Sequence, residues 1–401
     1  MDEAIRIGPE LKERREDAGL TQEALADRAG VSADYVGRLE RGARVGSLPS
    51  IVKLARALDC DPGDLIRKRA RLTPVGTSSV IAVRNAIFDP QLLLPDRPQG
   101  RPASPEELMR TVRRGYGAYF AGEFGALAAL VPDLLRDCRI AEYEHGTSAV
   151  AAPYAHAYDL ASALLVHTGK VDAALTGVER AIMIARQGDD PYRPVSFTGT
   201  YAWVLLHMGR YAEAEDLVVR AAESVAPRMG DRDQARIAAW GGLLMQAAVL
   251  AGSDAHRSDA DRLSSARQFL RDARSAAVQM DQDSRRYWIS FGPTQLAVQS
   301  AHIYTVLGKP AEALKAAGKV DARQLLSIQY GRHLLDVAKS QSLRRRTDDA
   351  IETAAQAQAL SPEWFRHQKF GAALTEELRR RKARMSDPLA GLVSAFRTTS
   401  E

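Results

Sequence analysis

Asp34, Arg38 and Arg41 follow one another at intervals of three or four residues near the start of the chain. An arginine guanidinium can donate paired hydrogen bonds to the edge of a guanine, and an aspartate carboxylate can accept one from the amino group of cytosine. Residues three or four apart share one face of an α-helix, so a helix here would present these groups together. The segment therefore has the chemistry to read DNA bases, provided that the chain holds it as an exposed helix.

The sequence predicts a helix, a tight turn and a second helix at this point. Thr21 and Ser32 are residue types that cap helix N-termini, and Gly30 between them can adopt the positive φ of a sharp turn. Val36 and Leu39 lie three residues apart and give the second helix one inward face. The caps, the turn glycine and the apolar spacing agree with one another, which argues against the alternative of an ordinary small helical bundle.

This arrangement resembles the helix-turn-helix of phage repressors and of the bacterial XRE regulators. The resemblance covers roughly residues 8–68, a five-helix unit whose other helices we predict from Pro9, over 48–59 and over 61–68. In this family the second helix of the motif lies in the major groove, with its N-terminal residues at the base edges.

The resemblance implies DNA contacts for nine residues. They are Gln22, Ser32, Ala33, Asp34, Tyr35, Arg38, Arg41, Arg44 and Ser47. Those from Ala33 to Arg38 would reach bases, Gln22 matches the glutamine that bonds a phosphate in this family, and the helix start at Ser47 offers backbone N–H groups to another phosphate. For each arginine, a solvated surface charge without DNA contact is the alternative.

Composition supports a nucleic-acid partner only modestly. The 401-residue chain has a formal net charge of +5, and between Arg38 and Arg71 nine Lys or Arg residues stand against four Asp or Glu. Such clustering can attract a polyanion.

The two cysteines, Cys60 and Cys138, lack metal-site spacing, so we expect a reducing cytoplasm. No signal peptide or membrane span is predicted.

The sequence carries no recognisable catalytic motif. A phosphate-binding glycine loop, an HExxH motif and a paired-cysteine site are all missing from it. Ser or Thr occurs near Gly146 and Gly199, but without the spacing of a nucleophile elbow. Glu144 followed by His145 is weak on its own, and the eight histidines are scattered. We therefore predict a protein that is not an enzyme and that uses no metal or cofactor.

The length of the chain predicts two or three domains. We expect a DNA-binding domain over 1–71, a linker with one possible short helix over 72–104, a helical-repeat domain over 105–385 and a C-terminal tail over 386–401. Four prolines between 89 and 104 favour a semi-rigid spacer. A loop packed on the next domain is the alternative.

A glycine-centred pattern recurs at 167–175, 207–215 and 306–314. Each copy joins the end of one predicted helix to the start of the next, and small residues five and twelve positions after Gly169 and Gly209 allow close helix packing. The pattern resembles tetratricopeptide repeats, although no unit carries their full consensus. The predicted fold class is all-α: a five-helix repressor-like domain followed by an α-solenoid of about five or six helix pairs. A single non-repeating bundle is the alternative.

A solenoid leaves an extended concave surface, and in the repeat family the first helix of each pair lines it. Counting back from the turn glycines places eight candidate ligand-binding residues there: His156, Asp159, His167, Trp203, His207, Gln246, Gln295 and His302. An aromatic ring among hydrogen-bonding side chains could hold a peptide or a small amphipathic ligand. The alternative is that these side chains are satisfied within the core.

The two halves together resemble bacterial regulators that join this DNA-binding head to tetratricopeptide-like repeats, including peptide-pheromone receptors. The resemblance implies a sequence-specific transcriptional regulator that binds operator DNA as a homodimer and senses a peptide or small-molecule ligand. In the alternative, the repeats are a scaffold that docks a partner protein and DNA binding only localises it. A contiguous apolar groove would favour the scaffold, and a polar lining favours the ligand.

Overall fold

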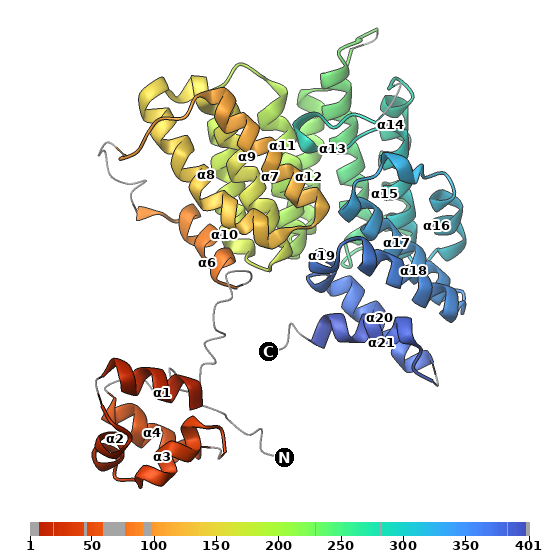
Figure 1. Cartoon of the computed structure of the whole chain (residues 1–401). Helices are drawn as coiled ribbons and strands as arrows, with labels where there is room; N and C mark the ends of the chain where they lie inside the picture. Colours follow the sequence, from red (N-terminus) through yellow and green to blue (C-terminus); the bar gives the residue numbers. More distant parts are fainter. Residues whose placement is uncertain are drawn as a thin grey trace. The chain divides into compact units, whose positions relative to one another are not determined.

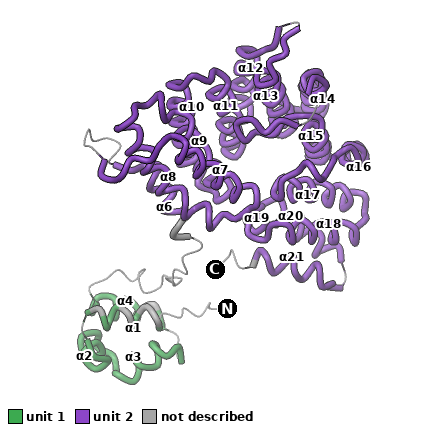
Figure 2. Tube along the Cα trace, turned by 45° about the horizontal axis from the view of Figure 1, so that its top comes forward, with its two compact units in different colours: residues 1–78 green, residues 79–401 purple. Residues whose placement is uncertain are grey.

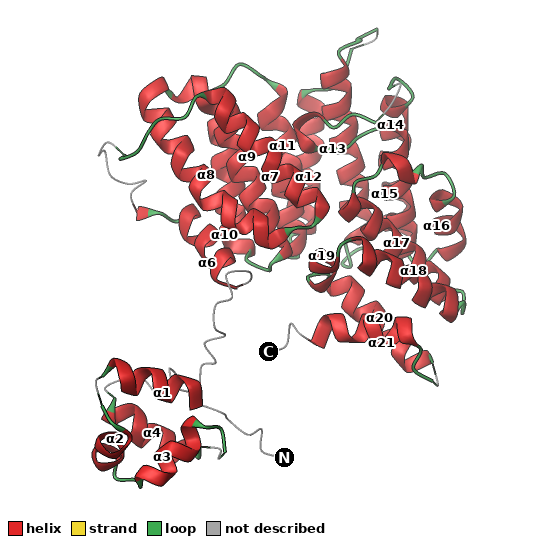
Figure 3. Ribbon diagram, viewed as in Figure 1, coloured by secondary structure: helices red, strands yellow, loops and turns green. Residues whose placement is uncertain are grey.

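The computed structural model describes residues 8–18, 20–43, 46–58, 77–90, 98–228, 230–280, 283–382 and 384–397. The chain forms two compact units, 1–78 and 79–401 (Figure 2). Within the described ranges every regular element is a helix, apart from an isolated antiparallel bridge between Ser284 and Phe291 (Figure 3). The predicted all-α fold class is confirmed.

Unit 1 contains four described helices, which are labelled in Figure 1. They are α1 (Gly8–Asp17), α2 (Gln22–Ala29), α3 (Ala33–Glu40) and α4 (Leu48–Ala57). Their apolar faces meet in one small core, centred on Leu11, Leu25, Val36, Leu39, Ile51 and Leu54. The fifth helix predicted over 61–68, and Cys60 before it, lie outside the described residues.

The turn between α2 and α3 has the predicted geometry. Thr21 Oγ1 accepts a hydrogen bond from the Ala24 backbone N–H at 3.1 Å, and Ser32 Oγ accepts one from that of Tyr35 at 3.2 Å. Gly30 has a φ of +62°, which a residue with a Cβ adopts only with strain. The sequence-predicted helix-turn-helix is therefore confirmed.

A buried polar contact joins the first three helices. Arg15 Nε of α1 donates to Glu40 Oε1 of α3 at 2.7 Å, and Gln22 Nε2 of α2 donates to Glu40 Oε2, also at 2.7 Å. The Glu40 side chain is only 3% exposed. Its hydrogen bond raises the pKa of Arg15 further above the ordinary arginine value. This contact fixes the C-terminal end of α3 on the rest of the unit.

Unit 2 contains six successive helix pairs. They are α7 (Pro105–Ala121) with α8 (Phe124–His145), α9 (Thr147–His167) with α10 (Val171–Ala185), α11 (Tyr192–His207) with α12 (Tyr211–Ser224), α13 (Gln234–Ser253) with α14 (Asp259–Ala277), α15 (Pro293–Val306) with α16 (Pro310–Ala317), and α17 (Ser327–Leu343) with α18 (Thr347–Leu360). Gly169, Gly209 and Gly308 turn the chain between paired helices with positive φ, as their recurrence predicts. Gly252 instead lies inside α13, so it is not an equivalent turn glycine.

The ends of unit 2 differ from the predicted boundaries. Helix α6 (Thr77–Ile87) buries Val83 and Ile87 in the same core as α7–α10, so part of the sequence expected to be a linker over 72–104 belongs to unit 2. The tail expected over 386–401 contains α21 (Asp387–Arg397). Leu389 and Leu392 lie three residues apart on one face of α21 and are buried in that core.

The solenoid closes on itself, which the sequence did not predict. The last helices, α19 (Pro362–Arg366), α20 (Lys369–Arg381) and α21, share one hydrophobic core with α7–α10. Ser361 Oγ donates to the Ala121 carbonyl at 3.0 Å, and the Gly125 N–H donates to Glu363 Oε1 at 2.7 Å. Trp364, which is 1% exposed, fills this junction. In Figure 2 the trace of unit 2 accordingly curls from α6–α9 round to α17–α21.

Helix α13 is long and apolar enough to cross a membrane by length and composition alone. However, 78% of its apolar stretch is buried inside unit 2. Burial by the neighbouring helices accounts for its composition, because a helix that is apolar on every side is typical of a protein core.

Candidate functional site

Helix α3 presents a charged pair to the exterior of unit 1. Arg38 Nε and Asp34 Oδ2 are 2.9 Å apart, and the two side chains are 54% and 64% exposed. Val36 and Leu39, on the opposite face, are buried in the core and fix the direction of the pair. Ala33 and Tyr35 are half-buried, and Ser32 is exposed at the helix start. The arrangement leaves a guanidinium, oriented by a carboxylate, at the surface where the resemblance implies base contacts.

The candidate phosphate contacts differ in their surroundings. The Gln22 side chain is directed at Glu40 within unit 1, and its phosphate contact stays a prediction. Arg41 is exposed. Ser47 Oγ hydrogen-bonds to Ser50 Oγ at 2.9 Å and accepts no capping hydrogen bond from a backbone N–H. The N–H groups at the start of α4 are therefore available to an anion. Arg44 lies outside the described residues.

We expect Arg38→Ala to weaken binding to the specific DNA site by about 1–3 kcal/mol while sparing binding to unrelated DNA. The reason is that a base contact is lost when its guanidinium is removed, whereas the bulk charge changes little. Arg28→Ala, which removes an exposed charge from α2, is the matched control. Titration of both variants with the specific duplex and with an unrelated duplex measures the loss of affinity for each. An equal loss on both duplexes would identify Arg38 as a phosphate contact instead.

Among the candidate ligand-binding residues, His156 and Asp159 of α9 are buried, with 4% and 6% exposure. The Tyr116 hydroxyl of α7 donates to Asp159 Oδ2 at 2.6 Å. Burial raises the pKa of Asp159 to about 6 and lowers that of His156 to about 3, so the histidine is neutral near pH 7. His156 and Asp159 therefore lie in the core, where Asp159 holds the Tyr116 side chain of α7.

Three other candidates form a row of rings. The centroids of His167 and Trp203 are 5.2 Å apart, as are those of Trp203 and His207. The Tyr119 hydroxyl lies 3.2 Å from His167 Nε2. In α15, Gln295 is buried and His302 Nδ1 lies 3.0 Å from Asp336 Oδ1. The eight predicted residues thus do not converge on a single site.

Two of the eight, Trp203 and Gln246, line a cavity of about 190 Å³ between α11, α13 and the segment 286–289. Its other lining residues are Ser196, Gly199, Thr200, Ala238, Ala239, Gly242, Leu243, Met245, Arg286, Tyr287 and Ile289. We call it the Trp203 cavity. Apolar walls with a few hydroxyl and amide groups are typical of small-ligand sites.

One wall of this cavity is a loop that the sequence did not predict. The Ser284 and Phe291 backbones pair through N–O contacts of 2.7 and 2.9 Å, and the chain between them forms a loop that we call the hairpin, Ser284–Phe291. At its tip, Tyr287 and Trp288 have φ values of +55° and +63°. Two consecutive aromatic residues in the left-handed region are strained. Glycine or asparagine, which usually signal such a turn, are absent from the tip.

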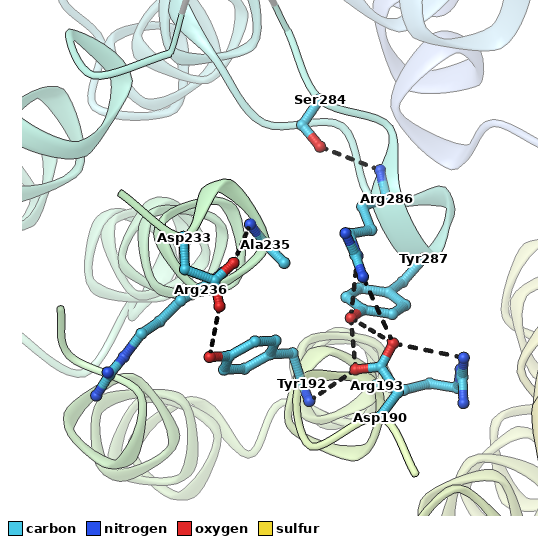
Figure 4. A network of polar contacts seen from close by, with 9 residues as sticks. All are labelled: Asp190, Tyr192, Arg193, Asp233, Ala235, Arg236, Ser284, Arg286 and Tyr287. Atoms are coloured by element: carbon cyan, nitrogen blue, oxygen red, sulfur yellow. Dashed lines mark hydrogen bonds and ion pairs between the residues drawn. The ribbon is translucent and has the colours of Figure 1, made fainter. Parts of the chain in front are cut away.

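Polar contacts join the hairpin to residues at the starts of α11 and α13 (Figure 4). The Tyr287 hydroxyl lies 2.7 Å from both carboxylate oxygens of Asp190, and so donates to that carboxylate. Asp190 also accepts from the Tyr192 N–H at 3.0 Å. The Tyr192 hydroxyl in turn donates to Asp233 Oδ2 at 2.8 Å, at the start of α13. The network thus couples the hairpin to both helices that form the Trp203 cavity.

No group of three or more His, Cys, Asp or Glu side chains in the described part of the chain is arranged to hold a metal ion. The helix-turn-helix domain family matches residues 6–68. A protein of Sinorhizobium fredii (strain NBRC 101917 / NGR234), described as the uncharacterized HTH-type transcriptional regulator y4dJ, is 35% identical over 77 residues, which are 19% of this chain and 99% of the relative.

Two solved structures of regulators align along most of the chain. Bacillus thuringiensis PlcR in complex with the peptide PapR7 and DNA is 14% identical, with 89% of this chain and 99% of that chain covered and a TM-score of 0.34. The apo form of the competence regulator ComR from Streptococcus vestibularis is 13% identical, with coverages of 86% and 98% and a TM-score of 0.31.

Proposed function

Because the chain belongs to the helix-turn-helix transcriptional regulators, we propose that it is a cytoplasmic regulator whose affinity for operator DNA is controlled by an effector in the Trp203 cavity. Helix α3 enters the major groove with Arg38 and Asp34 at the bases, and the start of α4 holds a phosphate. The chain acts as a homodimer, because one such head reads only a half-site. The effector is a small molecule or a peptide.

The observation that carries this proposal is the Trp203 cavity, with the strained hairpin as one of its walls. At about 190 Å³, the cavity is smaller than the roughly 300–1,000 Å³ of most ligand pockets. A small molecule fits it as it stands, whereas a peptide requires the hairpin to move. A ligand that favours the displaced hairpin shifts the equilibrium between the two conformations by its difference in affinity for them.

A protein-docking scaffold is the second candidate function. A partner helix would need an open apolar groove, whereas polar side chains such as Gln246 and Thr200 line the Trp203 cavity. These features favour a ligand over a docked helix.

Selection of bound fragments from the organism's genomic DNA, with and without its cell extract, tests the proposal. We expect enrichment of a paired half-site sequence, and a changed enrichment when the extract supplies the effector. In Gly199→Leu the response to extract is lost while the selected sequence is retained, because the added side chain fills the cavity. A Cβ at Gly199 meets no atom within 4 Å, so this helical position accepts the substitution.

Ala129→Leu adds similar bulk at an exposed position of α8 and serves as the control. It should respond to the extract as the unsubstituted chain does. Identical selections with and without extract would overturn effector control, and an undiminished response in Gly199→Leu would exclude the Trp203 cavity as the site.

A further inference from the structure

The hairpin separates two cavities. Arg286, Tyr287 and Ile289 line the Trp203 cavity, whereas Arg285, Trp288 and Ser290 line a second one on the other side. This second cavity has a volume of about 310 Å³ and also contains residues of α7 and the start of α17: Arg113, Tyr116, Gly117, Phe120, Ala121, Leu326 and Ser327. We call it the Tyr116 cavity.

Aromatic rings form the wall of the Tyr116 cavity. The rings of Tyr116 and Trp288 stack with centroids 4.5 Å apart and planes 13° apart, and Phe120 lies 6.3 Å from Tyr116. The hydrogen bond from the Tyr116 hydroxyl to the buried Asp159 holds this platform in place. A fixed set of ring faces favours a flat, apolar ligand, because aromatic groups pack on one another in offset-stacked or edge-to-face arrangements.

The charge of the cavity is positive. Arg113 and Arg285 are both exposed at its edge, and among the described residues neither guanidinium has an ion-pair partner. Arg285 donates to the Gln324 carbonyl at 2.8 Å, and this hydrogen bond fixes the direction of its guanidinium. The described lining residues include no carboxylate. By contrast, Arg286 on the other side of the hairpin lies 3.9 Å from Asp190.

A second feature also favours an anion here. Ser327, which lines the cavity, is the first residue of the 17-residue helix α17. The N-terminus of a helix carries partial positive charge and exposed N–H groups. Two guanidinium groups and this helix start therefore act on the same cavity, next to a platform of rings.

We propose that the Tyr116 cavity binds an arenecarboxylate, with the ring of the ligand against Phe120 and Trp288 and its carboxylate between Arg113 and Arg285. Arginine pairs with carboxylates through two parallel hydrogen bonds. The volume of about 310 Å³ lies at the lower end of the range for ligand pockets, which suits one or two fused rings. The same chemistry occurs in a free aromatic acid and in the C-terminal aromatic residue of a peptide.

Calorimetric titration of the full chain in the absence of DNA tests this site separately from effector control. The ligands are phenylacetate, naphthylacetate, the neutral naphthylacetamide and a tripeptide that ends in phenylalanine. We expect saturable binding of at least one carboxylate, and binding of the neutral amide that is roughly tenfold or more weaker. Preference for the free acids or for the tripeptide identifies the source of the carboxylate.

Matched variants locate the site. Gly117→Leu adds a side chain to the lining of the Tyr116 cavity, at a position where a Cβ meets no atom within 4 Å, and should abolish binding. Arg113→Gln should weaken it roughly tenfold or more, whereas Arg114→Gln, at the next exposed position, should not change it. Gly199→Leu, which fills only the Trp203 cavity, should also leave binding unchanged. Absence of saturable binding by every carboxylate, equal binding of acid and amide, or full binding by Gly117→Leu would overturn the proposal.

Discussion

Replacing Glu40 with alanine is expected to unfold unit 1 and to abolish DNA binding. The Glu40 carboxylate accepts hydrogen bonds from Arg15 of α1 and Gln22 of α2, and its removal takes the buried carboxylate away from the guanidinium of Arg15, which is 10% exposed. Breaking a buried ion pair from one side costs about 3–5 kcal/mol. A single core of fewer than about 70–80 residues rarely supplies more than about 3–5 kcal/mol of stability, so little would remain.

Thermal unfolding followed by calorimetry measures this effect, because the two units can unfold separately. The transition of unit 1 should disappear in Glu40→Ala while that of unit 2 is unchanged. Glu16→Ala is the control, since Glu16 also contacts Arg15 at 3.4 Å but has a side chain that is 56% exposed. We expect this variant to change the free energy of unfolding by no more than about 0.5 kcal/mol. If both variants unfold alike, the buried contact does not hold α3 in place.

Replacing Trp364 with alanine is expected to open the ring of unit 2. This side chain is 1% exposed, and a Cβ placed on Gly331 of α17 would come within 2.8 Å of its ring, so the packing is close. Removal of a buried tryptophan costs about 3–5 kcal/mol. Because Trp364 lies between the first and last helix pairs, we expect the loss to appear as opening of that junction.

Hydrogen exchange measured by mass spectrometry locates the opening. In Trp364→Ala, amide exchange should accelerate in α7 and in α19–α21, with little change in α13 and α14. Trp240→Ala removes the same side chain from a half-buried position in the second hydrophobic cluster, and should act on α13 instead. Equal protection of α19–α21 in both variants would show that the junction does not depend on Trp364.

Local signals in the sequence were sufficient for the helix-turn-helix of unit 1. Thr21 and Gly30 determine where α2 begins and ends, and Ser32 determines where α3 begins, through contacts with residues no more than four positions away. The turn glycines at 169, 209 and 308 located three helix pairs for the same reason.

Contacts between distant parts of the sequence were not predictable in this way. The Glu363–Gly125 and Ser361–Ala121 hydrogen bonds join residues more than 200 positions apart, and no periodic pattern encodes the closing of the ring. The positive φ values at Tyr287 and Trp288 come from tertiary contacts with Asp190 and Tyr116, against the preference of both residue types.

The candidate ligand residues also were predictable only as far as local signals reach. Counting helical turns from Gly209 placed Trp203 on the inner wall, where it lines a cavity. The same counting could not tell which inward residues would be covered by a neighbouring helix, as Asp159 is by Tyr116. Gln246 lines the Trp203 cavity even though Gly252, used to place it, is not a turn glycine.

Occupancy of the Trp203 cavity is proposed to change the affinity of the chain for operator DNA. Titration of the selected operator duplex, with and without the active fraction of the cell extract, measures this most directly. The proposal predicts a shift in affinity of roughly fivefold or more, the usual lower range of coupling between two sites, in the unsubstituted chain and in Ala129→Leu, but none in Gly199→Leu. Equal operator affinity with and without the fraction, or the same shift in Gly199→Leu, would contradict it.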